Sequence, residues 1–157
     1  MRGTERTRQP AVEVRAVCEC AGVDIEVLRL YAKAVMVEIG RHSLELSVLL
    51  ADDAYVRELN RRYRGVDRTT NVLAFPQQDS PESMPATRLL GDVVISVEKA
   101  RRDSARQQIP LMEELKKLVV HGILHLCGYD HRKTAQGTEM RRLERAVTER
   151  THDHDCS

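Results

Sequence analysis

Eleven residues, His121 to His131, constrain the fold of this chain more than any other stretch, because they hold three of its six histidines. His121 and His125 are four residues apart, so in a helix their side chains lie one turn apart on the same face and can share one metal ion. Gly128 can adopt the positive φ that ends a helix, which turns the chain back and makes His131 a third ligand. Three protein ligands leave the fourth tetrahedral position of a zinc ion open, as in catalytic sites.

The spacing matches the zinc-protease signature H-E-x-x-H-x-x-G-x-x-H at every position except the glutamate, which is Gly122 here. A glycine cannot accept a proton, so the carboxylate that activates water in those proteases is absent from its usual place. The pattern therefore predicts a metal site strongly and peptide hydrolysis only weakly. The alternative without a metal is that all three histidines are structural.

Two further blocks accompany this stretch: LNRRYRGVDRTTNVLAFP at residues 59–76 and LLGDVVIS at residues 89–96. Together the three blocks resemble the YbeY family of bacterial metal-dependent endoribonucleases, which act in ribosomal RNA maturation and ribosome quality control. They occur in the family's order, and the chain has about the family's length. LLGDVVIS alone would be a weak signal, whereas the two longer blocks together are highly specific.

The resemblance implies a zinc-dependent endoribonuclease that cuts single-stranded RNA, chiefly ribosomal RNA, with one Zn²⁺ per chain bound by His121, His125 and His131. The small ribosomal subunit and its assembly factors are the candidate partners. Two other interpretations remain open at this point. One is a zinc hydrolase of another substrate class, peptides included; the other is a ribosome-assembly factor whose metal is structural.

Five arginines stand between Arg57 and Arg68 against two acidic residues, which gives this segment a local charge of +3 in a chain of formal net charge +1. Such a run is either a solvated helix face or a basic patch that attracts a polyanion. Phosphodiester cleavage needs a cation near the phosphoryl oxygens, and an arginine fork suits them. By sequence alone Arg61, Arg62, Arg64 and Arg68 are equal candidates. The resemblance favours Arg64, which we predict as substrate-binding and, with His121, as catalytic.

A length of 157 residues with 41% hydrophobic and 31% charged residues is typical of one globular domain. No run approaches the ~20 apolar residues that span a bilayer, and residues 1–6 lack the apolar segment of a signal peptide. We therefore expect a cytoplasmic protein without membrane association. Its four cysteines contain no CxxC pair and are predicted to be free thiols, without disulfides.

Hydrophobic periodicity predicts strands at 11–17, 44–50, 71–75 and 89–96. It predicts helices from Asp24 to Gly40, from Asp52 to Gly65, from Ser96 to about Gln107, from Pro110 through His125, and from Thr134 to Thr148. On the second helix the expected apolar face is Tyr55, Val56, Leu59 and Tyr63; on the last it is Met140, Leu143 and Val147.

This order predicts a single α/β (α+β) domain over residues 1–157, with a small mixed sheet of about four strands and about five helices. The metal site is expected at the end of a central helix. Residues 1–9 and 150–157 are expected to be loose tails, the second including the solvated histidines His152 and His154. The proline-containing segment 77–88 is expected to be a surface loop beside the active-site cleft.

Overall fold

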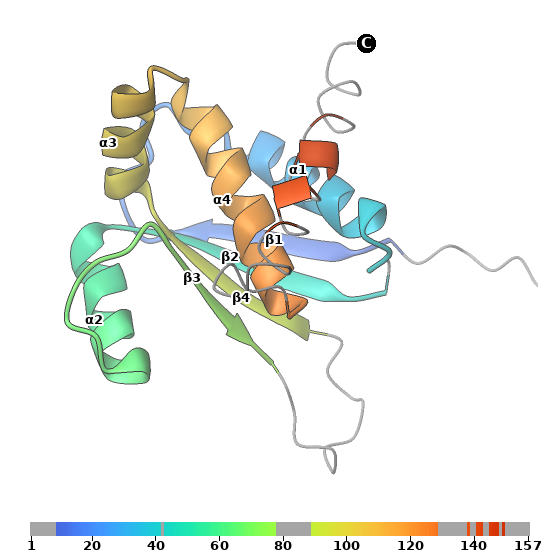
Figure 1. Cartoon of the computed structure of the whole chain (residues 1–157), viewed down its shortest axis with the longest axis horizontal. Coiled ribbons are helices and arrows are strands. Elements are labelled where there is room, and N and C mark those ends of the chain that lie inside the picture. Colours follow the sequence, from blue (N-terminus) through green and yellow to red (C-terminus); the bar gives the residue numbers. More distant parts are fainter. Residues whose placement is uncertain are drawn as a thin grey trace, which may run out of the picture.

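The computed structural model describes residues 9–41, 43–77 and 89–128, together with residues 138, 141–142, 145–147 and 149. The elements follow one another as shown in Figure 1: β1 (Ala11–Ala16), α1 (Ile25–Glu38), β2 (Glu45–Ala51), α2 (Asp53–Arg64), β3 (Val72–Pro76), β4 (Leu89–Ser96), α3 (Val97–Gln107) and α4 (Leu111–Leu126). The described residues from 138 to 147 are helical too, within the last helix that the sequence predicts, and residue 149 just beyond its predicted end is also helical.

The four strands form one sheet in the order β1-β2-β4-β3. β1 pairs with β2, and β2 with β4, in parallel, whereas β3 pairs antiparallel to β4 and lies at an edge. The predicted mixed sheet of four strands in a single α/β domain is therefore confirmed. β4 is buried on both faces over most of its length, as its continuous apolar sequence predicts.

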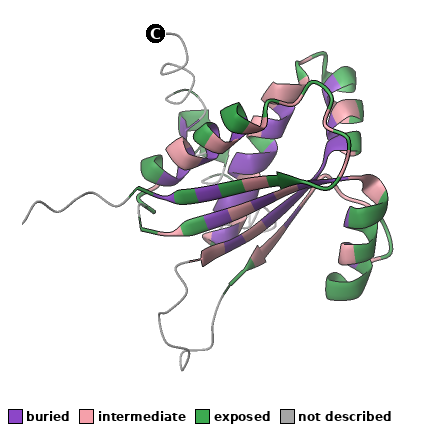
Figure 2. Cartoon of the chain, turned by 180° about the vertical axis from the view of Figure 1, so that it is seen from behind, coloured by how far each residue is buried: buried purple, intermediate pink, exposed green. Residues whose placement is uncertain are grey.

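The main core lies on the face of the sheet that α1 and α4 cover. Strand residues of one parity, such as Val48, Val93 and Ile95, point into it and are fully buried. α4 is apolar on most of its surface, and Figure 2 shows it as the most deeply buried helix behind the sheet. This burial fixes the position and the rotation of α4, the helix that carries His121 and His125.

α2 covers the opposite face, over a smaller core formed by Ala51, Val56, Leu73 and Val94. The predicted apolar face of α2 is wrong at two positions, because Tyr55 and Tyr63 are 41% and 63% exposed. Val56 is buried as predicted, and the residue one turn further that shares its face is the polar Asn60. Most of α2 is exposed in Figure 2, so its second half is free to present charged side chains to solvent.

Local sequence accounts for the ends of the helices. Asp24, Asp52 and Ser96 cap α1, α2 and α3, and each side chain accepts a hydrogen bond from a backbone N–H in the first turn. Gly65 ends α2 in the left-handed region with φ of 69°. Pro110, expected inside the first turn of α4, lies just before it.

Three of the four cysteines are described, and Cys18, Cys20 and Cys127 are free thiols, as predicted. The Sγ atoms of Cys18 and Cys20 lie 3.6 Å apart. Burial, followed by the neighbouring Cys20 thiol, raises the pKa of Cys18 to about 12, so this thiol is protonated at neutral pH.

None of the helices in the described part of the chain is long and apolar enough to cross a membrane. Val147 of the predicted last helix is buried. Residues 1–8 of the expected first tail, the expected tail at 150–157, the expected loop from 78 onward, and Met140 and Leu143 lie outside the described residues.

Candidate functional site

His121 and His125 lie in the last two turns of α4, as their spacing predicts. Their ring centroids are 4.6 Å apart and the rings are tilted by 46°. Both side chains are half-buried, between the core face of the helix and solvent. Because zinc binds histidine nitrogen at about 2.0–2.1 Å, two imidazoles this close can share a single ion.

Two close contacts hold this end of α4 against the sheet. A Cβ at position 122 would lie 2.6 Å from Cγ1 of Val93 on β4, so only glycine lets the helix approach this closely. A Cβ at Gly91 would lie 2.6 Å from Cδ2 of Leu126 and 2.5 Å from the carbonyl oxygen of Phe75. Gly122 therefore faces the sheet, not the side of the helix that carries His121 and His125. This packing is a physical reason for the missing glutamate.

α4 ends as the sequence predicts. Gly128 has a φ of 95° and donates its N–H to the carbonyl of His125 at 3.0 Å. The third predicted ligand, His131, lies outside the described residues. Within residues 9–41, 43–77 and 89–128, no group of three or more histidine, cysteine, aspartate or glutamate side chains lies close enough to bind a metal. Two of the three predicted ligands are thus brought together, and the donor set of paired imidazoles suits zinc.

Arg64 is the last residue of α2, on the other side of β3. Its neighbour Tyr63 contacts Phe75 of β3 edge to face, with ring centroids 5.6 Å apart. On the opposite face of the sheet, Leu126 of α4 packs at the backbone of Phe75 and Pro76 beside Gly91. The last turn of α2 and the last turn of α4 therefore meet the same end of β3 from opposite faces. The sequence predicts both ends separately, and the edge strand brings them together.

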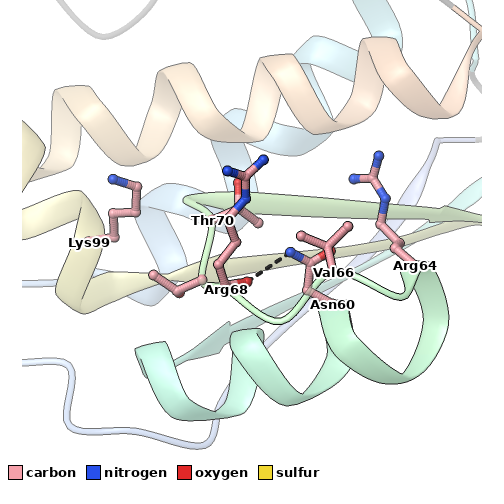
Figure 3. Close-up of a pocket in the computed structure, with 7 residues that line it drawn as sticks. Asn60, Arg64, Val66, Arg68, Thr70 and Lys99 are labelled. Atoms are coloured by element: carbon pink, nitrogen blue, oxygen red, sulfur yellow. Dashed lines mark hydrogen bonds between the residues drawn. The ribbon is translucent and has the colours of Figure 1, made fainter.

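Arg64 also lines a cavity of about 360 Å³, which the histidines do not line. The other described residues around it are Asn60, Val66, Arg68, Thr69, Thr70 and Lys99. Figure 3 shows Arg64, Arg68 and Lys99 in a row along β3, with their charged ends turned to the same side, toward the ribbon of α4. Lys99, Asn60 and the two threonines are absent from the predicted site.

The arginine-rich segment divides into paired and unpaired side chains. Arg57 binds Asp67 at 2.8 Å, Arg61 binds Glu58 at 2.6 Å, and Arg62 lies 3.8 Å from the same glutamate. Arg64 and Arg68 form no ion pair with any residue that the structure describes. The two unpaired arginines are the two that line the cavity. Their ion pairs make Arg61 and Arg62 weaker candidates than Arg64 for binding a phosphate, and Arg68 remains an equal candidate.

Hydrogen bonds fix the loop between α2 and β3 that carries Arg68. Asn60, only 5% exposed, donates from Nδ2 to the carbonyl oxygen of Arg68 at 2.8 Å. On one side of Arg68, the hydrogen bond from Arg57 holds the pKa of Asp67 below its usual value and pins that side chain. On the other side, the Thr69 hydroxyl lies 3.3 Å from Oδ1 of Asp53 and donates to it. The loop is therefore positioned before any ligand binds.

Asp53 links this loop to the start of α3. Its carboxylate accepts a hydrogen bond from the Ser96 hydroxyl at 2.6 Å and forms an ion pair with Arg102 at 2.8 Å. Burial alone would raise the pKa of Asp53, but the hydrogen bonds from Ser96 and Arg102 outweigh it and hold the pKa below its usual value. The carboxylate therefore stays ionised, and it keeps α3, with Lys99 in its first turn, beside the loop.

The fold and this site define a class of protein: a single α/β domain with a histidine pair and an arginine-lined cavity at one edge strand. The family model for Endoribonuclease YbeY matches residues 20–152. An Endoribonuclease YbeY from Rhodopseudomonas palustris (strain BisA53) is 43% identical over 145 residues, which cover 88% of this chain and 84% of the relative. One from Desulfitobacterium hafniense (strain Y51) is 46% identical, with coverages of 74% and 77%.

The solution structure of TM1509 from Thermotoga maritima superposes with a TM-score of 0.63 at 26% identity. The match covers 91% of this chain and 90% of that one. The chain belongs to the Endoribonuclease YbeY family. The resemblance stated from the sequence is therefore confirmed.

Proposed function

We propose that this protein is a zinc-dependent endoribonuclease that cuts single-stranded RNA in ribosomal RNA processing and ribosome quality control. Membership in a family of endoribonucleases makes it an enzyme of the nuclease class. One structural observation carries the rest. The ring centroids of His121 and His125 are 4.6 Å apart, and both rings lie at the same end of β3 as the guanidinium of Arg64, which has no ion pair with a described residue.

In this proposal His121, His125 and His131 hold one zinc ion per chain, and His121 also faces the reacting phosphate. When bound, zinc acts as a Lewis acid on a phosphoryl oxygen and lowers the pKa of water that it binds to about 7. The half-buried positions of His121 and His125 support this assignment, since imidazoles at the edge of a core hold their orientation yet can still be reached.

Arg64 binds the substrate in this proposal. A guanidinium stays protonated throughout the physiological range and can donate two parallel hydrogen bonds to one phosphate. As charge develops on the nonbridging oxygens, those bonds strengthen, which lowers the barrier to cleavage. Arg64 has no carboxylate partner among the described residues, so no ion pair has to break before it binds.

Peptide hydrolysis is disfavoured because position 122 packs on Val93. No carboxylate can replace this glycine unless Val93 or α4 shifts, so the acid–base residue of the protease signature has no room there as the two are packed. RNA, in contrast, offers its own 2′-OH as an internal nucleophile. An unpaired strand also reaches an edge site more easily than a rigid duplex does. This proposal also makes the small ribosomal subunit a partner of the protein and the cytoplasm its location.

The test measures zinc content and RNA cleavage in the same preparations. Wild type should hold one zinc per chain and cut single-stranded RNA, cut duplex poorly, and lose activity with chelator. His121→Ala and His125→Ala should lose both metal and cleavage, whereas Lys117→Ala on the exposed side of α4 should lose neither. Full zinc occupancy in the double histidine variant contradicts the metal assignment.

Three further outcomes decide the reaction. Bound zinc with uncut RNA would make the metal structural and the protein an assembly factor. Hydrolysis of a casein-type substrate with RNA untouched would overturn the nuclease proposal. A 2′-O-methyl RNA separates the two nucleophiles, because continued cutting indicates attack by water and resistance indicates attack by the 2′-OH.

A further inference from the structure

The cavity beside Arg64 is built to hold more negative charge than one arginine can neutralise. Arg64, Arg68 and Lys99 all line it, and none of the described residues around it is acidic. Two threonines, Thr69 and Thr70, add polar side chains to the same wall. A cavity of about 360 Å³ whose described lining includes three cations and no carboxylate is suited to phosphate groups.

Lys99 and Arg68 are available to a ligand. The ammonium of Lys99 contacts one carboxylate, that of Asp103, at 3.7 Å, and Arg106 lies at the same distance from that carboxylate. Arg68 has no ion pair with a described residue, although three other arginines of its segment do. The backbone of Arg68 is held through its carbonyl by Asn60, so its position costs little entropy when a ligand binds.

The three cations are spread along the length of β3. Arg64 lies at the end of the strand, because its neighbour Tyr63 packs on Phe75. Lys99 lies at the start, because its helix follows Ser96, whose N–H bonds the carbonyl of Asn71 just before the strand. At ~3.3 Å per residue, the five residues of β3 cover about 13 Å. Along the axis of a stacked strand one phosphate follows the next with a rise of ~3.4 Å, so this row is longer than a single phosphate needs.

We propose that Arg68 and Lys99 form a second phosphate-binding subsite, which holds the RNA backbone at least one nucleotide away from the phosphate bound by Arg64. This inference rests on the proposed function in taking RNA as the ligand. The second subsite positions the strand along the edge of β3 and makes productive binding depend on substrate length. It contributes to affinity and register, not to the chemical step.

The experiment measures binding, not cleavage. A fluorescent ten-nucleotide oligouridylate is titrated with protein in chelator at several salt concentrations, and a gel verifies that the RNA stays intact. For single strands each phosphate contact contributes about 0.7 to the slope of log K against log salt. The Arg68→Gln/Lys99→Gln variant loses its contact with one phosphate, so it should lose about 0.7 from that slope and bind about tenfold more weakly or worse.

The matched control is Arg62→Gln/Lys33→Gln, which removes the same charge from α2 and α1 outside the cavity. It should keep the wild-type slope. Arg68→Lys keeps a cation in place and should restore most of the slope that Arg68→Gln loses. Equal slopes for the cavity variant and the control, with both proteins folded by circular dichroism, would overturn the proposal.

Oligouridylates of two to ten nucleotides then show whether Arg68 and Lys99 bind a second phosphate or share one phosphate with Arg64. Affinity of the wild type should rise in a step once a second phosphate reaches Arg68 and Lys99, and the cavity variant should lose that step but keep its affinity for the dinucleotide. An equal loss for every length would place all three cations on one phosphate and overturn the second subsite. If RNA shows this length-dependent binding but is never cut, the proposed nuclease function is contradicted while the second subsite is supported.

Discussion

The two faces of β3 position functional side chains in different ways. On the α4 face, His121 and His125 extend from a helix whose other sides are buried among aliphatic residues, so packing against the sheet orients them. On the α2 face, Arg64 and Arg68 are exposed, and hydrogen bonds of buried polar groups such as Asn60 orient the backbone beneath them. Side chains that bind a metal need a fixed geometry. Side chains that bind phosphate need a fixed backbone and a charged end that can still move.

The largest effect should come from the packed face. Gly122→Glu, which restores the protease signature, places a carboxylate against Val93, where even a Cβ would approach within 2.6 Å. Overpacking together with a buried charge should cost on the order of 5 kcal/mol, which is enough to unfold many domains of this size. Thermal unfolding followed by circular dichroism measures it. Lys117→Glu, which introduces the same side chain on the exposed side of α4, should shift stability by less than about 0.5 kcal/mol.

On the other face, Arg64→Gln should change chemistry and not stability. Loss of the guanidinium should lower kcat by about 10²–10³-fold, the usual effect of removing one transition-state donor. Because Arg64 is exposed and unpaired among the described residues, Tm and zinc content should stay at the wild-type values. Arg62→Gln, on the same helix but paired with Glu58, is the control and should retain full turnover. A large fall in Tm with unchanged kcat would instead make Arg64 a structural residue.

Asn60→Ala tests whether hydrogen bonds hold the arginine loop. It removes the donor to the Arg68 carbonyl and leaves that acceptor unsatisfied, which should cost about 1–2 kcal/mol in the free energy of unfolding. RNA affinity should fall severalfold with it, since the Arg68 backbone would no longer be fixed. Denaturant unfolding and RNA titration measure the two effects. Full stability with full affinity would show that the loop holds itself without Asn60.

The smallest effect should come from Tyr63→Ala. The side chain is 63% exposed and makes an edge-to-face contact with Phe75, so its loss should cost only about 0.5–1 kcal/mol. The same contact sets the last turn of α2 on β3, so turnover should fall while zinc content is unchanged. Tyr55→Ala, also exposed on α2, supplies the comparison and should leave turnover unaffected.

The sequence by itself determined the elements and the histidine pair of the candidate site. Caps at Asp24, Asp52 and Ser96 and the glycine at 128 act through hydrogen bonds and backbone freedom within a few residues, so their effect can be read locally. The same holds for the pairing of His121 with His125, which needs only helical spacing.

The sequence could have predicted that Arg61 and Arg62 pair with Glu58, because those residues are three and four apart on one helix. Only the tertiary structure decided why position 122 is glycine and that Lys99 lines the same cavity as Arg64. Both depend on contacts between segments that are far apart in the sequence: Val93 of β4 packs against α4, and α3 begins beside the loop before β3. The error at Tyr55 and Tyr63 has the same origin, because an apolar spacing does not say which part of a helix the sheet will cover. Strand pairing, not local propensity, brings such residues together, since the sheet sets the distance between elements that local sequence leaves open.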